Sequence, residues 1–148
     1  MSKLVDLPYE TTKYVHDRCL CFATQRAARA LARRFDEALR PVGLTNGQFS
    51  LLMSLNRPEP PSISAVASLL AMDRTTLTAN LKPLERRGLL ETTVDPSDRR
   101  GRRIVLTRDG RRLLRKAMPV WEREHAAVDQ QLAGTDPAAL RAGLRALA

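Results

Sequence analysis

Apolar residues recur at helical spacing in the first part of the chain, and residues 12–39 predict one long helix. Its main apolar stripe consists of Val15, Cys19, Phe22, Ala27, Ala30, Leu31, Phe35 and Ala38. A second stripe of smaller residues consists of Cys21, Ala28 and Ala32. Because two sides of this helix can pack, we expect it to lie between other elements or between subunits. Pro41 and Gly43 end it.

The middle of the chain predicts two further helices before a tight turn. Thr45 and Gln48 have the spacing of a capping box, and the helix after them carries Phe49, Leu52, Met53 and Leu55. Residues 62–64 predict a very short strand. Ser64 then caps a second helix, whose inward residues are Val66, Ala67, Leu69 and Leu70.

A third helix follows the turn at residues 71–73. Asp73 is its expected N-cap, Gly88 ends it, and its inward stripe is Leu77, Leu81 and Leu84. Pro83 lacks a backbone N–H and is expected to kink the helix near its end. Two short helices joined by such a turn match the helix-turn-helix pattern.

The last part of the chain predicts a hairpin and two helices. Residues 89–94 and 103–106 read as strands, and the loop between them is rich in turn-forming residue types. Thr107 caps a helix to about residue 132 with a coiled-coil-like seam, which Pro119 interrupts. The seam consists of Leu114, Met118, Trp121, His125, Val128 and Leu132. Asp136 and Pro137 open a final helix with Leu140, Leu144 and Leu147.

The formal charge of +9 makes nucleic acid the first candidate partner and an anionic membrane surface the second. The charge is concentrated, because residues 82–116 hold twelve Lys and Arg against five Asp and Glu. No apolar run has the length of a membrane span, and residues 1–8 lack the apolar core of a secretion signal. We therefore expect a cytoplasmic protein without a disulfide framework and with no membrane partner.

The polar face of the helix over residues 74–87 suits the major groove of DNA. It carries Arg74, Thr75, Thr76, Thr78 and Lys82 but no acidic residue between Arg74 and Lys82, and Ser64 precedes it on the neighbouring helix. The hairpin tip carries Asp98, Arg99, Arg100 and Arg102. An arginine at such a tip can enter the minor groove, and we expect Asp98 to hold Arg100 in an ion pair. The plainer alternative is a solvated basic turn.

Together these segments resemble the MarR (multiple antibiotic resistance regulator) family. The resemblance extends over residues 12–132 and rests on Gly43-Leu44-Thr45, Gln48-Phe49, Met72 to Thr78, Leu84 to Leu89, Asp95 to Arg100, Leu106-Thr107 and Gly110. It implies a mainly α fold of the α+β winged helix-turn-helix type with N- and C-terminal dimerisation helices. The whole chain is then one domain, with a DNA-binding lobe at residues 45–107 and dimerisation helices at residues 10–40 and 108–148.

The resemblance also implies a homodimer that binds a pseudo-palindromic double-stranded DNA operator, usually as a repressor, and is released by a small-molecule effector. The candidate dimer residues are Val15, Phe22, Trp121, His125, Leu140 and Leu144. The candidate effector residues are Cys21, Gln25, Phe49, Met53 and Met72. The operator, the regulated genes, the effector and the sign of regulation do not follow from the sequence.

The segment around Cys21 resembles that of the hydroperoxide-sensing branch of the family. Gln25 and Phe49 stand where that branch has tyrosines, so a small buried cysteine at a packing face is the favoured interpretation, with thiol-based sensing as the alternative. Cys19 and Cys21 would lie about 200° apart on one helix and could not pair. His16 and Cys19 share a face but lack a third ligand, so we expect no metal site and no cofactor.

Two other classes of function compete with a specific regulator. An enzyme is disfavoured, because the sequence has no glycine-rich phosphate loop, no His/Cys/Asp cluster and no paired carboxylates in a suitable context. An architectural winged helix that grips DNA without sequence choice remains open. The two DNA-binding classes differ in whether changing Thr76 or Thr78 alters operator preference.

Overall fold

The computed structural model describes residues 6–148, so most of the segment inspected for a secretion signal lies outside the described residues. The chain forms two compact units, residues 1–34 and 35–148, which we describe separately. The described residues include no helix with the length and apolar character that a membrane crossing requires.

The first unit contains α1 (Tyr9–Arg18) and most of α2 (Leu20–Leu39). The prediction of one continuous helix is therefore wrong at Cys19, whose backbone is extended (φ −76°, ψ 107°). The Cys19 sulfur accepts a hydrogen bond from the backbone N–H of Phe22 at 3.3 Å, as an N-cap side chain does. Neither proline nor glycine marks this break in the sequence, and the apolar periodicity continues across it. The sequence pattern therefore predicted a single helix.

The second unit begins at the end of α2, where Phe35 and Leu39 are buried. The short 3-10 helix η1 (Arg40–Val42) is followed by Gly43, whose φ of 75° favours glycine. In α3 (Asn46–Ser54) both hydrogen bonds of the expected capping box between Thr45 and Gln48 are present. The Asp36 carboxylate also accepts a hydrogen bond from the Asn46 backbone N–H at 2.7 Å, which ties the start of α3 to α2.

In α4 (Ile63–Leu69) the structure corrects two predictions. Ser62, not Ser64, is the N-cap, because the Ser62 hydroxyl accepts a hydrogen bond from the Ala65 N–H at 3.1 Å. The expected short strand is reduced to a single bridge between Ser62 and Arg103. Leu69 is 57% exposed instead of inward, because α4 is only seven residues long and buries Val66 and Ala67.

The recognition-helix candidate is α5 (Arg74–Arg86), and its predicted cap and inward stripe are both confirmed. The Asp73 carboxylate accepts a hydrogen bond from the Thr76 N–H, and Leu77, Leu81 and Leu84 are buried. Pro83 lies inside the helix. The turn between α4 and α5 contains Ala71 with φ 51°, a left-handed conformation that is unusual for a residue with a Cβ atom.

The hairpin, here called the wing, consists of β1 (Leu90–Asp95) and β2 (Asp98–Leu106). The strands are antiparallel from Leu90↔Leu106 to Val94↔Arg102, and a bulge follows before Asp95↔Asp98. β2 is thus longer than predicted, and the tip arginines belong to this strand instead of an open loop. The extra residues of the bulge include Arg99 and Arg100 of the tip, and the pairs from Leu90 to Val94 stay in register.

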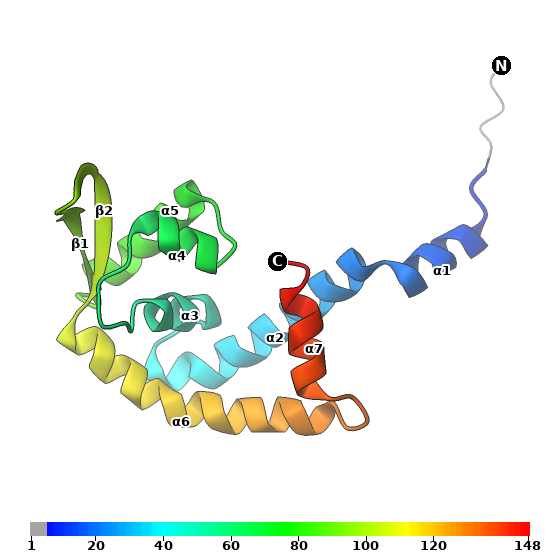
Figure 1. Cartoon of the computed structure of the whole chain (residues 1–148). Helices are drawn as coiled ribbons and strands as arrows, with labels where there is room; N and C mark the ends of the chain where they lie inside the picture. The colour runs from blue at the N-terminus through cyan, green and yellow to red at the C-terminus, as the bar shows by residue number, and fades with distance from the viewer. Residues whose placement is uncertain (1–5) are drawn as a thin grey trace, which may run out of the picture. The chain divides into compact units, whose positions relative to one another are not determined.

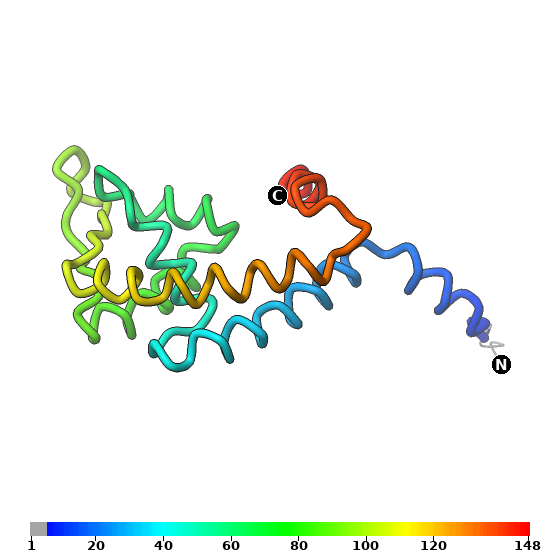
Figure 2. The backbone as a smooth tube through the Cα atoms, turned by 90° about the horizontal axis from the view of Figure 1, so that it is seen from below, coloured from blue at the N-terminus to red at the C-terminus, as the bar shows by residue number. Residues whose placement is uncertain are grey.

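The long helix α6 (Arg108–Gln131) begins at Thr107, whose hydroxyl caps it as predicted, and α7 (Pro137–Arg145) begins after Asp136. In Figure 1 the wing stands at one end of α6 and α7 at the other, and Figure 2 shows α6 running out from the lobe that holds α3, α4 and α5. The core gathers residues from α2, α3, α4, α5, the wing and α6, among them Leu39, Leu52, Val66, Leu77, Leu84, Leu90, Ile104, Leu106 and Leu114. This core fixes α5 and the wing on one body.

Candidate nucleic-acid interface

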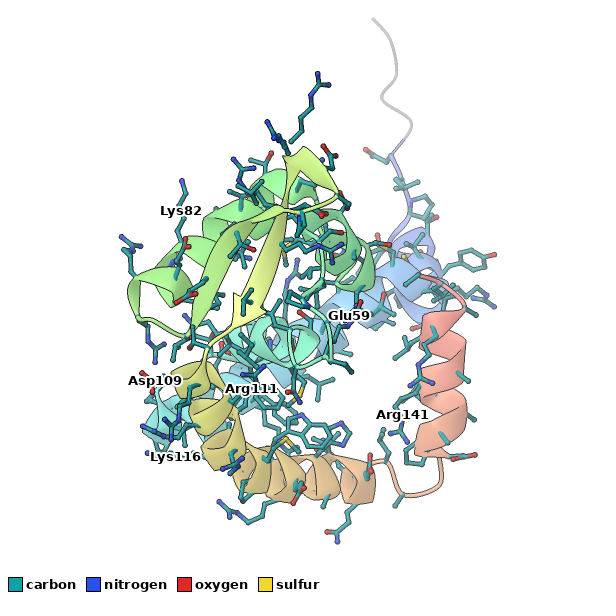
Figure 3. The ribbon with its side chains drawn as sticks, turned by 60° about the vertical axis from the view of Figure 1, so that its left-hand side comes forward. Glu59, Lys82, Asp109, Arg111, Lys116 and Arg141 are labelled. Atoms are coloured by element: carbon teal, nitrogen blue, oxygen red, sulfur yellow. The ribbon has the colours of Figure 1, made fainter. Side chains whose placement is uncertain are left out.

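The face of α5 opposite its leucines is exposed and basic. A hollow of about 350 Å³ on this face is lined by Arg74, Thr75, Thr78, Ala79 and Lys82. Figure 3 shows Lys82 extending from α5 away from the body of the lobe. Small side chains between two cations leave room for a nucleic acid to approach the helix axis.

The threonines of this face differ in their hydrogen bonds. Thr76 donates two hydrogen bonds to the Asp73 carboxylate, one from the Thr76 backbone N–H at 2.8 Å and one from the Thr76 hydroxyl at 2.7 Å. These hydrogen bonds, led by the one from the Thr76 side chain, lower the pKa of Asp73 below its ordinary value. The Thr78 hydroxyl donates to the Arg74 carbonyl oxygen at 2.8 Å, one helical turn earlier.

An ion pair that the sequence analysis missed lies at the base of the wing tip. The Arg103 Nε lies 3.2 Å from Asp95 Oδ1, and the Arg103 Nη1 donates to the Pro60 carbonyl oxygen at 2.7 Å. Asp95 Oδ1 also accepts hydrogen bonds from the N–H and hydroxyl of Ser97. The Ser97 hydrogen bonds, with a smaller contribution from Arg103, lower the pKa of Asp95. Asp95 and Arg103 therefore join the wing tip to the loop before α4.

The predicted ion pair between Asp98 and Arg100 is not what the structure shows. The Asp98 carboxylate accepts a hydrogen bond from the backbone N–H of Arg100 at 3.0 Å, because the bulge turns that N–H toward it. Asp98 thus shapes the tip backbone. The Arg102 Nη1 donates to the carbonyl oxygens of Arg99 and Gly101, so this guanidinium folds back on the tip. Arg99 and Arg100 are exposed, and within residues 6–148 their guanidinium groups have no acidic partner.

The remaining predicted contact and effector residues lie at different places. Ser64 is exposed on α4. Phe49 is buried and stacks on Trp121 with ring centroids 6.3 Å apart, and the Met72 sulfur accepts a hydrogen bond from Asn80 Nδ2 at 3.6 Å. The hollow on α5 does not include Phe49, Met53 or Met72. In the first unit Cys21 is exposed, so the favoured interpretation of a small buried cysteine is wrong in this chain, and the Cys21 sulfur accepts a hydrogen bond from Gln25 Nε2 at 3.2 Å.

The candidate dimer residues include several exposed apolar side chains. Val15 and Phe22 are exposed in the first unit, and Leu140 and Leu144 are exposed on α7. Trp121 and His125 are half-buried, with ring centroids 4.7 Å apart, and His125 Nδ1 lies 3.6 Å from Asp129 Oδ1. Among residues 6–148, no group of three or more His, Cys, Asp and Glu side chains is arranged to hold a metal ion.

Comparison with known sequences identifies regulators. A model of the MarR family matches residues 44–101. The regulator TtmR of Methylorubrum extorquens is 38% identical over 97 residues, which are 66% of this chain and 50% of TtmR, so the match spans half of that relative. The organic hydroperoxide resistance transcriptional regulator of Bacillus subtilis is 30% identical over 101 residues, which are 68% of this chain and 69% of that protein.

Solved structures of regulators share the fold. The Mycobacterium tuberculosis regulator MosR, crystallised in complex with DNA, is 38% identical, has a TM-score of 0.76, and matches over 88% of this chain and 93% of its own. The repressor CouR, bound to a 23-mer DNA duplex, is 30% identical, has a TM-score of 0.79, and matches over 90% of this chain and 94% of its own. CouR has also been solved bound to p-coumaroyl-CoA. With its winged helix-turn-helix fold, this chain belongs to the MarR family.

Proposed function

We propose that this protein is a sequence-specific DNA-binding transcriptional regulator, and that it represses. The observation that carries the proposal is the pairing of an acid-free, exposed face on α5 with exposed arginines on the wing of the same lobe. Helix and wing contacts of this kind divide between base edges and phosphates. That MosR and CouR were solved with DNA supports the same conclusion.

A titration of the purified protein with labelled duplexes tests this function. Fluorescence anisotropy with DNA from upstream of its own gene, in excess competitor DNA, is expected to show specific binding. Arg100→Ala is expected to weaken it about tenfold or more, because one good arginine contact contributes about 1–3 kcal/mol. Arg123→Ala, an exposed arginine on α6, serves as the control and should bind normally. If the unmodified protein, Arg100→Ala and Arg123→Ala bound DNA with equal affinity, the proposed contact of the wing with DNA would be refuted.

The active form is proposed to be a homodimer. The exposed Val15 and Phe22 of the first unit and the exposed Leu140 and Leu144 of α7 would be covered by a second copy, since removing apolar side chains from water is favourable. A protein truncated to residues 12–132 is expected to form a weaker dimer, which in sedimentation experiments dissociates at higher protein concentrations than the full chain does. A stable dimer without both ends would contradict this interface.

We propose that a small molecule controls DNA release. The candidate residues are Cys21, Gln25, Phe49, Met53 and Met72, and CouR bound to p-coumaroyl-CoA illustrates such a ligand in a relative. Thermal-shift measurements with phenolic acids, acyl thioesters and hydroperoxides would find the class, because a ligand that binds only the folded state raises its melting temperature. A molecule that raises the melting temperature is then expected to release labelled DNA from the protein.

A second candidate mechanism is peroxide sensing through Cys21. It is favoured by the exposure of Cys21 and by the Gln25 hydrogen bond to its sulfur, since a sensing thiol must be accessible. Cys21→Ser should leave hydroperoxide-induced DNA release unchanged if a small molecule is the signal. Loss of that response in Cys21→Ser, but not in Cys19→Ser, would establish the thiol mechanism instead.

A further inference from the structure

The hydroxyl groups of Thr76 and Thr78 are both engaged inside the protein. Each threonine hydroxyl has one proton to donate. Thr76 donates its proton to Asp73 Oδ2 at 2.7 Å, and Thr78 donates its proton to the Arg74 carbonyl oxygen at 2.8 Å. In the described part of the chain the Thr75 hydroxyl has no hydrogen-bond partner, and Thr75 is exposed like Thr76 and Thr78.

These two bonds hold the side chains in fixed orientations. The Asp73 carboxylate accepts hydrogen bonds from both the N–H and the hydroxyl of Thr76, and hydrogen bonds to an ionised carboxylate are stronger than those between neutral groups. The Thr78 bond is the back-bond to the fourth residue before it that threonine forms in helices. With its proton committed, each hydroxyl could meet a base only as an acceptor, whereas the γ-methyl group of each exposed side chain takes part in no hydrogen bond.

We infer that Thr76 and Thr78 read DNA by apolar contact of their methyl groups with thymine methyl groups, and that Thr75 supplies the one free threonine hydroxyl of this face. The inference rests on the proposed DNA-binding function and specifies how its sequence choice arises. In the major groove only thymine presents a methyl group, whereas guanine N7 and O6 require a donor. Arg74 and Lys82 flank the threonines and supply such donors.

Thr78 allows a clean separation of its two groups. Thr78→Ser keeps the hydroxyl and removes the methyl, whereas Thr78→Val keeps the methyl and removes the hydroxyl. Both changes leave the Asp73 cap of α5 intact, and a thermal melt by circular dichroism checks that each variant folds. The DNA is a duplex that the unmodified protein selects from a random-sequence library, and it is made with thymine or with uracil, which lacks the methyl group, at single positions.

We expect Thr78→Val to keep the affinity and sequence preference of the unmodified protein, and Thr78→Ser to bind about fourfold more weakly for each half-site, the equivalent of one buried methyl group per subunit. Uracil at the contacted position should weaken the unmodified protein by the same factor and Thr78→Ser not at all. At Thr75 the order should reverse, with Thr75→Val binding more weakly than Thr75→Ser.

Several results would overturn the inference. They are selected half-sites without thymine, a larger loss with Thr78→Val than with Thr78→Ser, no effect of uracil at any position, or the same order at Thr75 as at Thr78. The proposed function fails separately, because in that case the unmodified protein selects no sequence from the library. If it selects a sequence but the valine variant does not bind that sequence, regulation stands and only the mode of reading is refuted.

Discussion

Gly110 is the position at which a single added carbon should do most damage to the lobe. It is buried in the first turn of α6, where its N–H donates to the Thr107 cap at 3.0 Å. A Cβ atom built on it would lie 2.2 Å from the carbonyl oxygen of Leu89 and 2.7 Å from Leu106 Cδ1. The first of these atoms belongs to the backbone and cannot rotate away, so Gly110→Ala must move α6 or the segment before the wing.

The loss of stability in Gly110→Ala follows from the packing and hydrogen bonds that this movement would disturb. The Leu89 carbonyl oxygen accepts the Thr107 N–H at 3.1 Å, and the Thr107 hydroxyl donates to Gly88 at 2.7 Å. Overpacking of a core costs about 1–3 kcal/mol, and a strained hydrogen bond adds about 1 kcal/mol. The better helix propensity of alanine returns at most about 1 kcal/mol. We therefore expect Gly110→Ala to lower the free energy of unfolding by about 1–3 kcal/mol.

Urea unfolding followed by circular dichroism measures this loss at fixed protein concentration. Gly47→Ala is the matched control, because Gly47 lies in the first turn of α3, its φ is not positive, and a Cβ there meets nothing within 4 Å. The control should be neutral or more stable by up to about 1 kcal/mol. If Gly110→Ala were as stable as Gly47→Ala, the close packing of α6 on Leu89 would be refuted.

Three further expectations concern the turn and the wing. Ala71→Gly removes the strain of φ 51° and should raise the unfolding free energy by up to about 1 kcal/mol, read from the urea midpoint. Arg103→Met cuts the bonds to Asp95 and Pro60 and should weaken DNA binding in anisotropy titrations while the circular dichroism spectrum stays unchanged. The folded-state pKa of Asp95 is lowered, so its stabilisation is present above about pH 4 and is lost as the pH falls through the folded pKa. Urea midpoints of Asp95→Asn should consequently decline less on acidification than those of the unmodified protein.

Helix starts were predictable because the signal for each is local. Thr45, Asp73, Thr107 and Asp136 each cap the helix that their sequence spacing indicates. Side-chain oxygen and backbone N–H lie two or three residues apart in these caps, so no knowledge of the fold is needed. The inward leucines of α5 were predictable for the same reason, since helical periodicity alone selects them.

The predictions from sequence are wrong where a distant segment or an unusual capping group determines the local structure. The break at Cys19 depends on a sulfur acting as a cap, and no proline or glycine announces it. Ser62 and Ser64 are equivalent by residue type, but only Ser62 bridges to Arg103, a residue of β2 far along the chain. The choice of cap at α4 is thus made by the wing.

The direction of the wing tip likewise depends on distant residues, so it could not be derived from the tip sequence. Spacing alone suggested Asp98 and Arg100 as partners, whereas the strand register pairs Thr93 with Arg103, and Asp95, two residues after Thr93, forms the ion pair with Arg103. Arg103 in turn reaches the Pro60 carbonyl, so the direction of the tip depends on the loop before α4. Since α4 packs on α5, one chain of contacts runs from the wing arginines to the threonine face. The spacing between α5 and the wing, the two elements proposed to contact DNA, is therefore set by contacts that are non-local in sequence, while the groups that they present are set locally.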